Sequence, residues 1–232
     1  MSETGALGLF GGTFDPVHIG HLRLAIEARA ALGLREVPLI PAGNPPLRIA
    51  PRCPAEQRLA MVERAVADLP GFSIDRSEVD AVTGPSYTID TLVRQRRLHG
   101  PQRPLVLLLG ADAFSRLEAW QRWRELFDLA HIAVATRPGH DLTIPAETQG
   151  TGARQGQETA LDAEFLARQG TAADLATAPA GRIVCFAITA LEISATAIRE
   201  RLARGGNVRH LVPDAVLDYI DSHQIYRTPH GH

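Results

Sequence analysis

The residues of this chain that are best suited to chemistry lie in one short run near the N-terminus. The run reads Gly11-Gly12-Thr13-Phe14-Asp15-Pro16-Val17-His18-Ile19-Gly20-His21. Glycine lets a backbone approach a phosphate closely, and a helix beginning near Gly20 would direct its unpaired N–H groups and positive dipole end toward that anion. His18 and His21 are three residues apart, so at a helix start they share a face and both can donate to phosphoryl oxygens. The run therefore predicts a phosphate-binding loop. The alternative is a tight turn with capping or core histidines.

A second group of hydrogen-bond donors lies near the C-terminus, in the run Ile193-Ser194-Ala195-Thr196-Ala197-Ile198-Arg199. Ser194 can cap a helix whose next turn carries Thr196 and Arg199. A hydroxyl, N-terminal amides and a guanidinium would then converge on one point, which suits the β- and γ-phosphates of a nucleoside triphosphate. An ordinary capped helix with a solvated arginine is the alternative.

Strand-like and helix-like segments alternate around these two motifs. Strands are expected at residues 6–10, 37–40, 72–75, 105–109, 132–135 and 183–188, and helices at 21–34, 54–69, after 85–86, at 195–204 and at 213–222. The segment 105–109 is purely aliphatic, which is typical of a strand buried on both faces of a parallel sheet. We therefore expect an α/β fold, a doubly wound Rossmann-like parallel sheet with a C-terminal helical part. Ligands of such sheets bind at the carboxyl ends of the strands.

The stretch of about 141–180 breaks the alternation, being rich in Ala, Gly, Thr and Gln with one helical patch at 161–166. We interpret it as an insertion or mobile excursion within a single domain of residues 1–228. Its role as a lid, an interaction element or a disordered segment stays open.

Bulk properties exclude several classes of protein. The 232-residue chain has a formal net charge of -2, which argues against a broad nucleic-acid surface. Cys53 and Cys185 lie in unrelated contexts, so neither a disulfide framework nor a zinc site is indicated, and a cytoplasmic location is expected. No apolar stretch approaches the roughly 18 residues of a membrane span. The oligomeric state stays open, a homo-oligomer included.

The N-terminal run resembles the (H/T)xGH signature of the nucleotidylyltransferase superfamily, and its longer form GGTFDPVHxGH is similar to that of the bacterial nicotinate-nucleotide adenylyltransferase family. The resemblance covers nearly the whole chain apart from the excursion. Further matches in family order are Pro45-Pro46, the run SYTIDTL at 86–92, Gly110-Ala111-Asp112, Trp120, Arg137-Pro138-Gly139, the Ser194 motif, Tyr219-Ile220 and Ile225-Tyr226. It implies transfer of AMP from ATP to nicotinate mononucleotide.

The resemblance assigns roles that the residues alone leave open. His18, His21 and Arg199 become the catalytic residues. The expected ATP-binding residues are Gly11, Gly12, Thr13, Phe14, Gly20, Asp112, Arg137, Ser194 and Thr196. By pattern alone, Asp112 could equally be a helix cap, Arg137 a solvated loop residue, and Trp120 with Trp123 core residues of an amphipathic helix.

The mononucleotide would be bound by Asn44, Arg48, Thr88, Trp120 and Gln121, with the Trp120 ring stacked on the pyridinium. One departure from the family stands out, because relatives commonly carry Pro-Pro-His-Lys where this chain has Pro45-Pro46-Leu47-Arg48. A basic side chain remains, but the imidazole that would contact the mononucleotide phosphate does not.

The expected reaction is in-line attack by the 5′-phosphate of the mononucleotide on the α-phosphorus of ATP. A phosphate is already an anionic nucleophile, so charge neutralisation and positioning would suffice without a general base. Mg²⁺ is expected, held mainly by the ATP phosphates and water, with no protein metal site.

Three alternatives remain. A sister transferase would use nicotinamide mononucleotide, phosphopantetheine, or a sugar or alcohol phosphate. A class I aminoacyl-tRNA synthetase would need a KMSKS-like loop and an anticodon domain, which the sequence lacks. A non-catalytic nucleotide sensor would not need the groups that grip the leaving pyrophosphate.

Overall fold

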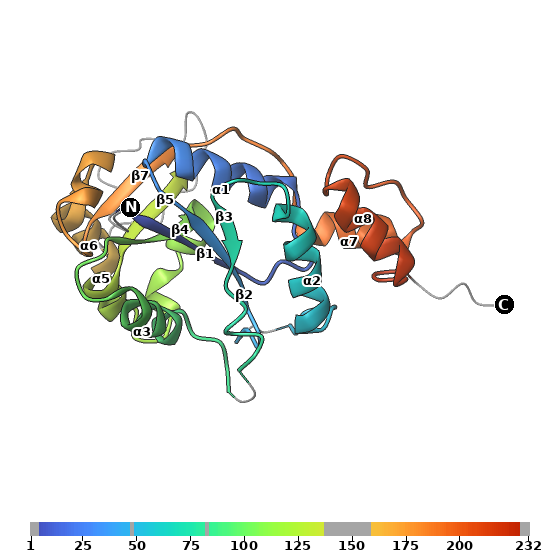
Figure 1. The fold of residues 1–232 in the computed structure, drawn as a ribbon, viewed down its shortest axis with the longest axis horizontal. Helices are drawn as coiled ribbons and strands as arrows, with labels where there is room; N and C mark the ends of the chain where they lie inside the picture. Colours follow the sequence, from blue (N-terminus) through green and yellow to red (C-terminus); the bar gives the residue numbers. More distant parts are fainter. Residues whose placement is uncertain (1–4, 47–48, 82–83, 137–158, 228–232) are drawn as a thin grey trace. The chain divides into compact units, whose positions relative to one another are not determined.

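A computed structural model describes residues 5–46, 49–81, 84–136 and 159–227 of the chain. Its centre is a seven-stranded sheet in the order β3-β2-β1-β4-β5-β7-β6 (Figure 1). The strands are β1 (Leu7–Gly12), β2 (Val37–Pro41), β3 (Phe72–Ile74), β4 (Leu105–Gly110), β5 (His131–Thr136), β6 (Gln169–Gly170) and β7 (Ile183–Ala187). The pairs β1–β2, β2–β3, β4–β5, β5–β7 and β6–β7 all run parallel. The predicted doubly wound parallel sheet is therefore confirmed.

Helices follow most of the strands. The α-helices are α1 (Ile19–Ala31), α2 (Ala55–Val66), α3 (Thr88–His99), α4 (Ala111–Phe114), α5 (Leu126–Leu129), α6 (Ala160–Arg168), α7 (Ala195–Ala203) and α8 (Asp214–Ser222), and the short 3₁₀ turns are η1 (Leu117–Ala119), η2 (Trp123–Glu125) and η3 (Ala172–Ala176). The last two α-helices form the expected C-terminal helical part. None of the helices in the described ranges is long and apolar enough to cross a membrane.

The chain divides into two compact units, and it crosses between them several times. The first unit comprises residues 1–8, 28–35 and 88–190, and the second comprises residues 9–27, 36–87 and 191–232. In the first unit the aliphatic strand β4 and strand β5 are almost wholly inaccessible to solvent, as the all-apolar pattern predicts. The prediction of a single domain stays a prediction.

In the second unit, helices α2 and α8 pack against one another, with the Arg64 guanidinium 4.2 Å from the centroid of the Tyr219 ring. Helix α2 buries Leu59 and Val62, and also Arg58. Pro54 precedes the first helical residue, where its fixed φ is favourable. This unit holds both motifs identified from the sequence.

The predicted excursion contains more structure than its composition suggests. Residues 137–158 lie outside the described residues, but 159–180 hold α6, β6 and η3. Thr159 begins α6 with a capping box, in which its hydroxyl and the Asp162 carboxylate satisfy each other's backbone N–H groups. The helical patch predicted at 161–166 is confirmed, whereas β6 was missed because two residues carry no usable periodicity.

The structure excludes one alternative that the sequence pattern had left open. Trp120 and Trp123 do not share an amphipathic helix, because Trp120 ends the 3₁₀ turn η1 in an extended conformation and Trp123 begins η2 after the left-handed residue Arg122. Trp123 is buried against Phe127, with ring centroids 6.2 Å apart, as a packing residue should be. Trp120 is only partly buried.

Candidate active site

The signature loop, residues 11–21, runs from the end of β1 into the first turn of α1. A Cβ on Gly12 would lie 2.8 Å from the Phe14 ring, so any larger residue there would have to displace that ring. The Phe14 ring itself is buried and meets the His21 ring edge-on at 5.1 Å between centroids. Phe14, which the resemblance places among the ATP-binding residues, can therefore offer a nucleotide only its backbone.

The two histidines of the loop lie against each other. Their rings stack with centroids 3.6 Å apart and an interplanar angle of 21°. The backbone N–H of His18 donates to Nδ1 of His21 at 3.3 Å, and the backbone N–H of His21 donates to Nδ1 of His18 at 3.4 Å. Because each Nδ1 accepts, each neutral ring carries its proton on Nε2, which is the nitrogen left to donate to a ligand.

Both imidazoles are held in the neutral form. Burial lowers the pKa of His18 from 6.5 to about 4, against a smaller opposing effect of its backbone hydrogen bond. Burial lowers the pKa of His21 well below its ordinary value, and the charge of a protonated His18 contributes a smaller effect in the same direction. At neutral pH the pair is therefore two N–H donors and not two cations.

The predicted free N–H groups at the start of α1 are mostly taken. The Ile19 N–H donates to the Leu211 carbonyl at 2.9 Å, and the His21 N–H also donates to the His18 carbonyl at 3.0 Å. The prediction that these amides face the anion is thus wrong for both residues, because a turn from the C-terminal part covers the first and the histidine contacts occupy the second. Side chains must supply more of any phosphate binding than the sequence indicated.

The second motif meets the signature loop within the same unit. Ser194 is the N-cap of α7, and its hydroxyl accepts from the Ala197 N–H at 3.2 Å, which confirms the predicted cap. Arg199 donates through Nη1 to the Asp15 carbonyl oxygen at 2.7 Å and through Nη2 to the Thr196 hydroxyl at 3.2 Å. The guanidinium has five N–H donors in total, so it retains donors for an anion. The two motifs that the sequence linked to one triphosphate are therefore in contact.

Asp15, which no motif in the sequence assigns a role of its own, is the residue that joins the signature loop to these parts. Its buried carboxylate accepts from the Tyr226 hydroxyl at 2.6 Å and from the Arg52 N–H at 2.8 Å. Arg199 Nη1 lies 3.8 Å from the same carboxylate. The partners come from three separate stretches of sequence, so no local pattern could reveal them.

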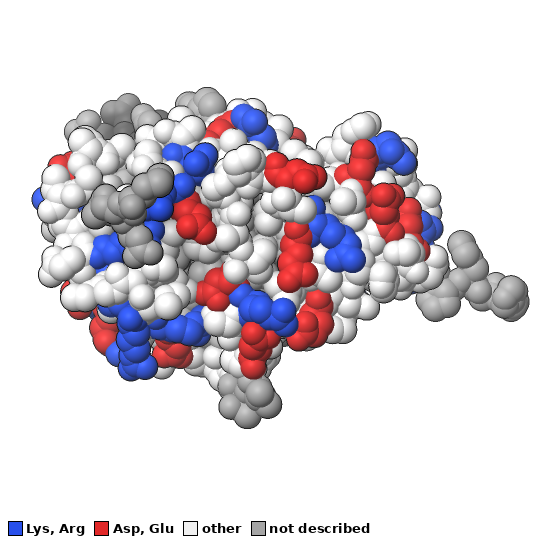
Figure 2. Space-filling view, in the orientation of Figure 1, with Lys and Arg blue, Asp and Glu red and all other residues white. Residues whose placement is uncertain are grey.

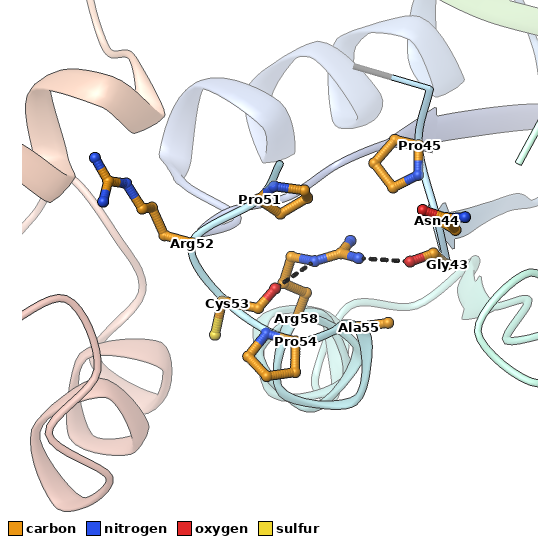
Figure 3. Close-up of a pocket in the computed structure, with 9 residues that line it drawn as sticks. All are labelled: Gly43, Asn44, Pro45, Pro51, Arg52, Cys53, Pro54, Ala55 and Arg58. Atoms are coloured by element: carbon orange, nitrogen blue, oxygen red, sulfur yellow. Dashed lines mark hydrogen bonds between the residues drawn. The ribbon is translucent and has the colours of Figure 1, made fainter. Parts of the chain in front are cut away.

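Arg58 lies beneath the loops and is 1% exposed. It donates to the Cys53 carbonyl at 3.1 Å, to the Thr13 carbonyl at 2.7 Å and to the Gly43 carbonyl at 3.1 Å, and Figure 3 shows the guanidinium between the first and last of these segments. Burial lowers its pKa, and Asp15 is the largest opposing effect. A single buried cation thus ties the signature loop to the segment after β2.

An open cavity of about 330 Å³ lies next to this arginine, lined by Gly43, Asn44, Pro45, Pro51, Arg52, Cys53, Pro54, Ala55 and Arg58 (Figure 3). The Asn44 amide donates to the Gly84 carbonyl at 3.1 Å, and the Asn44 N–H donates to the Ser86 hydroxyl at 3.0 Å. Asn44 thereby holds two loops of the predicted acceptor region together. The Arg52 side chain points away from the cavity in the same view.

The remaining predicted acceptor and nucleotide residues belong to the other unit or are not described. Thr88 is the first residue of α3, Asp112 lies exposed in α4 after β4, and Gln121 is exposed beside Trp120. All four belong to the first compact unit. Arg48 and Arg137 lie outside the described residues.

Charge is mixed over the face of the molecule in Figure 2. On the face shown in Figure 2, acidic and basic side chains are interspersed over the described residues. No group of three or more His, Cys, Asp or Glu side chains in the described part of the chain is arranged to hold a metal ion. The candidate site is instead a set of neutral and cationic N–H donors.

Comparisons with known proteins agree with this geometry. The cytidylyltransferase-like family model matches residues 9–201. A protein of Dechloromonas aromatica named "Probable nicotinate-nucleotide adenylyltransferase" is 52% identical over 228 residues, 98% of this chain and 99% of that protein. A protein of the same name from Aeromonas hydrophila is 47% identical and covers 95% of this chain and 97% of its own length.

Solved structures agree on the fold. The Plasmodium falciparum nicotinic acid mononucleotide adenylyltransferase complexed with NaAD has a TM-score of 0.66 at 14% identity, covering 96% of this chain and 97% of that chain. The same enzyme complexed with APC has a TM-score of 0.63 at 15% identity, over 96% and 97% of the two chains. With half of its residues shared with one full-length relative, this chain belongs to the nicotinate-nucleotide adenylyltransferase family, a group of nucleotidyltransferases within the cytidylyltransferase-like proteins.

Proposed function

We propose that this protein transfers AMP from ATP to nicotinate mononucleotide, releasing pyrophosphate and forming nicotinate adenine dinucleotide. The observation that carries the proposal is the contact of Arg199 with Asp15, since it places the α7 guanidinium at the histidine loop. Two proteins named "Probable nicotinate-nucleotide adenylyltransferase" are 52% and 47% identical to this chain over nearly its full length, which supports the choice of acceptor. A cytoplasmic location is part of the proposal.

In the proposed reaction, an oxygen of the acceptor 5′-phosphate forms a bond to the α-phosphorus of ATP. The bond between that phosphorus and the oxygen bridging to the β-phosphorus breaks, and pyrophosphate leaves with the electron pair. The Nε2–H groups of His18 and His21 donate to the α-phosphoryl oxygens, where negative charge increases. Arg199, with Ser194 and Thr196 beside it, binds the leaving pyrophosphate.

The donor set also bears on how Mg²⁺ would bind. Asp15, the carboxylate within the signature loop, already accepts from the Tyr226 hydroxyl and the Arg52 N–H, and Arg199 Nη1 lies 3.8 Å from it. Mg²⁺ prefers oxygen ligands and keeps several waters, so the phosphates of ATP would hold it and the site fits that arrangement. When bound there, the ion neutralises phosphate charge.

Three of the proposed acceptor residues, Thr88, Trp120 and Gln121, belong to the first unit. Trp120 is partly exposed, as a residue that stacks on a pyridinium ring must be, whereas its neighbour Trp123 is buried. Thr88 begins a helix, so its N–H is among those without an intrahelical partner and can receive the nicotinate carboxylate.

The test is release of pyrophosphate from ATP and Mg²⁺ with each acceptor supplied in turn. We expect rapid release with nicotinate mononucleotide and slower release with nicotinamide mononucleotide or phosphopantetheine. Preference for another acceptor would identify a sister transferase. Tight binding of ATP without release on any acceptor would identify a nucleotide sensor and overturn the proposal.

A further inference from the structure

Tyr226, which follows α8 near the C-terminus, contacts the signature loop at Asp15. Its hydroxyl donates to Oδ1 of Asp15 at 2.6 Å, across 211 residues of sequence. The other carboxylate oxygen accepts from the Arg52 N–H at 2.8 Å. Each oxygen of this buried carboxylate therefore has a donor other than Arg199.

The chain places Tyr226 there by a defined turn. After α8, Gln224 takes a left-handed conformation with φ 53°, and Ile225 donates its N–H to the Ile220 carbonyl at 3.0 Å. Ile225 is 7% exposed, so it anchors the turn in the core. Tyr226 also adopts a left-handed conformation, with φ 61°. A sharp turn held by one buried side chain aims the phenol at Asp15.

The phenol can act only as the donor in this contact. Burial, together with the neighbouring Asp15 carboxylate, raises the pKa of Tyr226 far above its usual value, so the hydroxyl keeps its proton. Asp15 is thus bound by a permanent neutral donor, which satisfies an oxygen without adding charge.

Asp15 presents two acceptors to Arg199, its backbone carbonyl oxygen and its carboxylate. Its Nη1 makes a 2.7 Å hydrogen bond to the carbonyl oxygen but lies 3.8 Å from carboxylate Oδ2. Without the Tyr226 hydroxyl, the under-satisfied carboxylate would draw the guanidinium closer, from the present 3.8 Å ion pair into a hydrogen-bonded one. An arginine paired in that way competes with a triphosphate for the same N–H groups.

We propose that Tyr226 is a positioning residue, which satisfies the Asp15 carboxylate and so leaves the Arg199 guanidinium free to bind the β- and γ-phosphates of ATP. This inference rests on the proposed function for the identity of the anion. It assigns to the C-terminal turn a role in ATP affinity that is separate from its packing.

The experiment compares Tyr226→Phe with Tyr219→Phe in the full chain. Tyr219 is matched because it also lies in the C-terminal part, and within the described residues no hydrogen bond of its hydroxyl is seen. Calorimetry measures affinity for ATP and for AMP, which lacks the β- and γ-phosphates. We expect Tyr226→Phe to weaken ATP binding by about tenfold, on the order of one charged hydrogen bond, and AMP binding by less than about twofold. Tyr219→Phe should change neither.

A double-mutant cycle shows whether the effect passes through Arg199. In an Arg199→Ala background, Tyr226→Phe should have no further effect on ATP affinity. Equal losses for ATP and AMP, or a further loss in that background, would overturn the positioning role and leave only a structural one.

The binding readout also separates this inference from the proposed function. If the wild-type protein binds ATP but releases no pyrophosphate with any acceptor, the proposed function fails while the affinity comparison still decides the role of Tyr226. If steady-state assays succeed, the KM for ATP should rise in Tyr226→Phe while the KM for nicotinate mononucleotide stays within about twofold, and a rise in both would contradict the inference.

Discussion

The Nδ1 atoms of His18 and His21 each accept a hydrogen bond from the other residue's backbone N–H, at 3.4 and 3.3 Å. This reciprocal arrangement fixes the tautomer of both rings and leaves both Nε2–H groups as donors. Two stacked neutral rings, rather than two cations, are what the loop presents to a phosphate.

Replacing His21 by alanine should therefore remove one donor to the developing charge. We expect His21→Ala to lower kcat by about 10²-fold, the scale seen when a donor of this kind is lost. The fold should be retained, as circular dichroism can check. His223→Ala, at the exposed end of α8, is the control and should leave turnover unchanged. Unaltered turnover in His21→Ala would remove this residue from the mechanism.

The lowered pKa of His18 predicts a loss of stability in acid. The unfolded chain takes up a proton near pH 6.5 and the folded chain only near pH 4. The unfolded state thus binds more protons between these values, so the free energy of unfolding falls as pH drops through this window. At pH 5 the loss from His18 alone is about 2 kcal/mol. Urea denaturation at pH 7 and pH 5 measures it.

A His18→Asn variant isolates that contribution, because asparagine can accept the His21 N–H without titrating. Its stability should depend less on pH between 7 and 5 than that of the wild type. The remaining dependence would come from His21 and His131, whose pKa values burial also lowers. An identical pH dependence in the two proteins would show that His18 is not the titrating group.

Removal of the buried Arg58 should be costly for stability. Arg58→Ala leaves three carbonyl oxygens without their donor and opens space beneath the loops, so we expect a loss of about 3–5 kcal/mol in the free energy of unfolding. Arg76→Ala is the matched control, since that arginine makes an exposed ion pair with Asp80 and should cost less than about 1 kcal/mol. Similar losses in both variants would argue against the structural role of Arg58.

The acceptor side can be tested at Trp120. Trp120→Ala should raise the KM for nicotinate mononucleotide by about tenfold through lost ring stacking, with the KM for ATP nearly unchanged. Trp120→Phe keeps an aromatic face and should stay within about threefold of the wild type. If alanine and phenylalanine behave alike at this position, stacking on the pyridinium is not the source of acceptor affinity.

The sequence by itself determined the local features of this protein. The glycine and histidine run between β1 and α1, the Ser194 cap of α7 and the aliphatic strand β4 were all predictable, because each depends on residues within one or two turns of chain. The family followed from the same runs. The element boundaries also lay within a few residues of those observed.

Only the tertiary structure decided how the site is held. Arg58 occupies an ordinary polar position in the sequence of α2, yet its carbonyl partners include Thr13, 45 residues away. Asp15 and Tyr226 are 211 residues apart, and the tautomers of the two histidines depend on backbone N–H groups whose directions are set by the turn into α1. A hydrogen bond between residues far apart in the sequence forms only when the packed sheet and helices bring those residues together. Residue types and local spacing do not show which distant segments will meet.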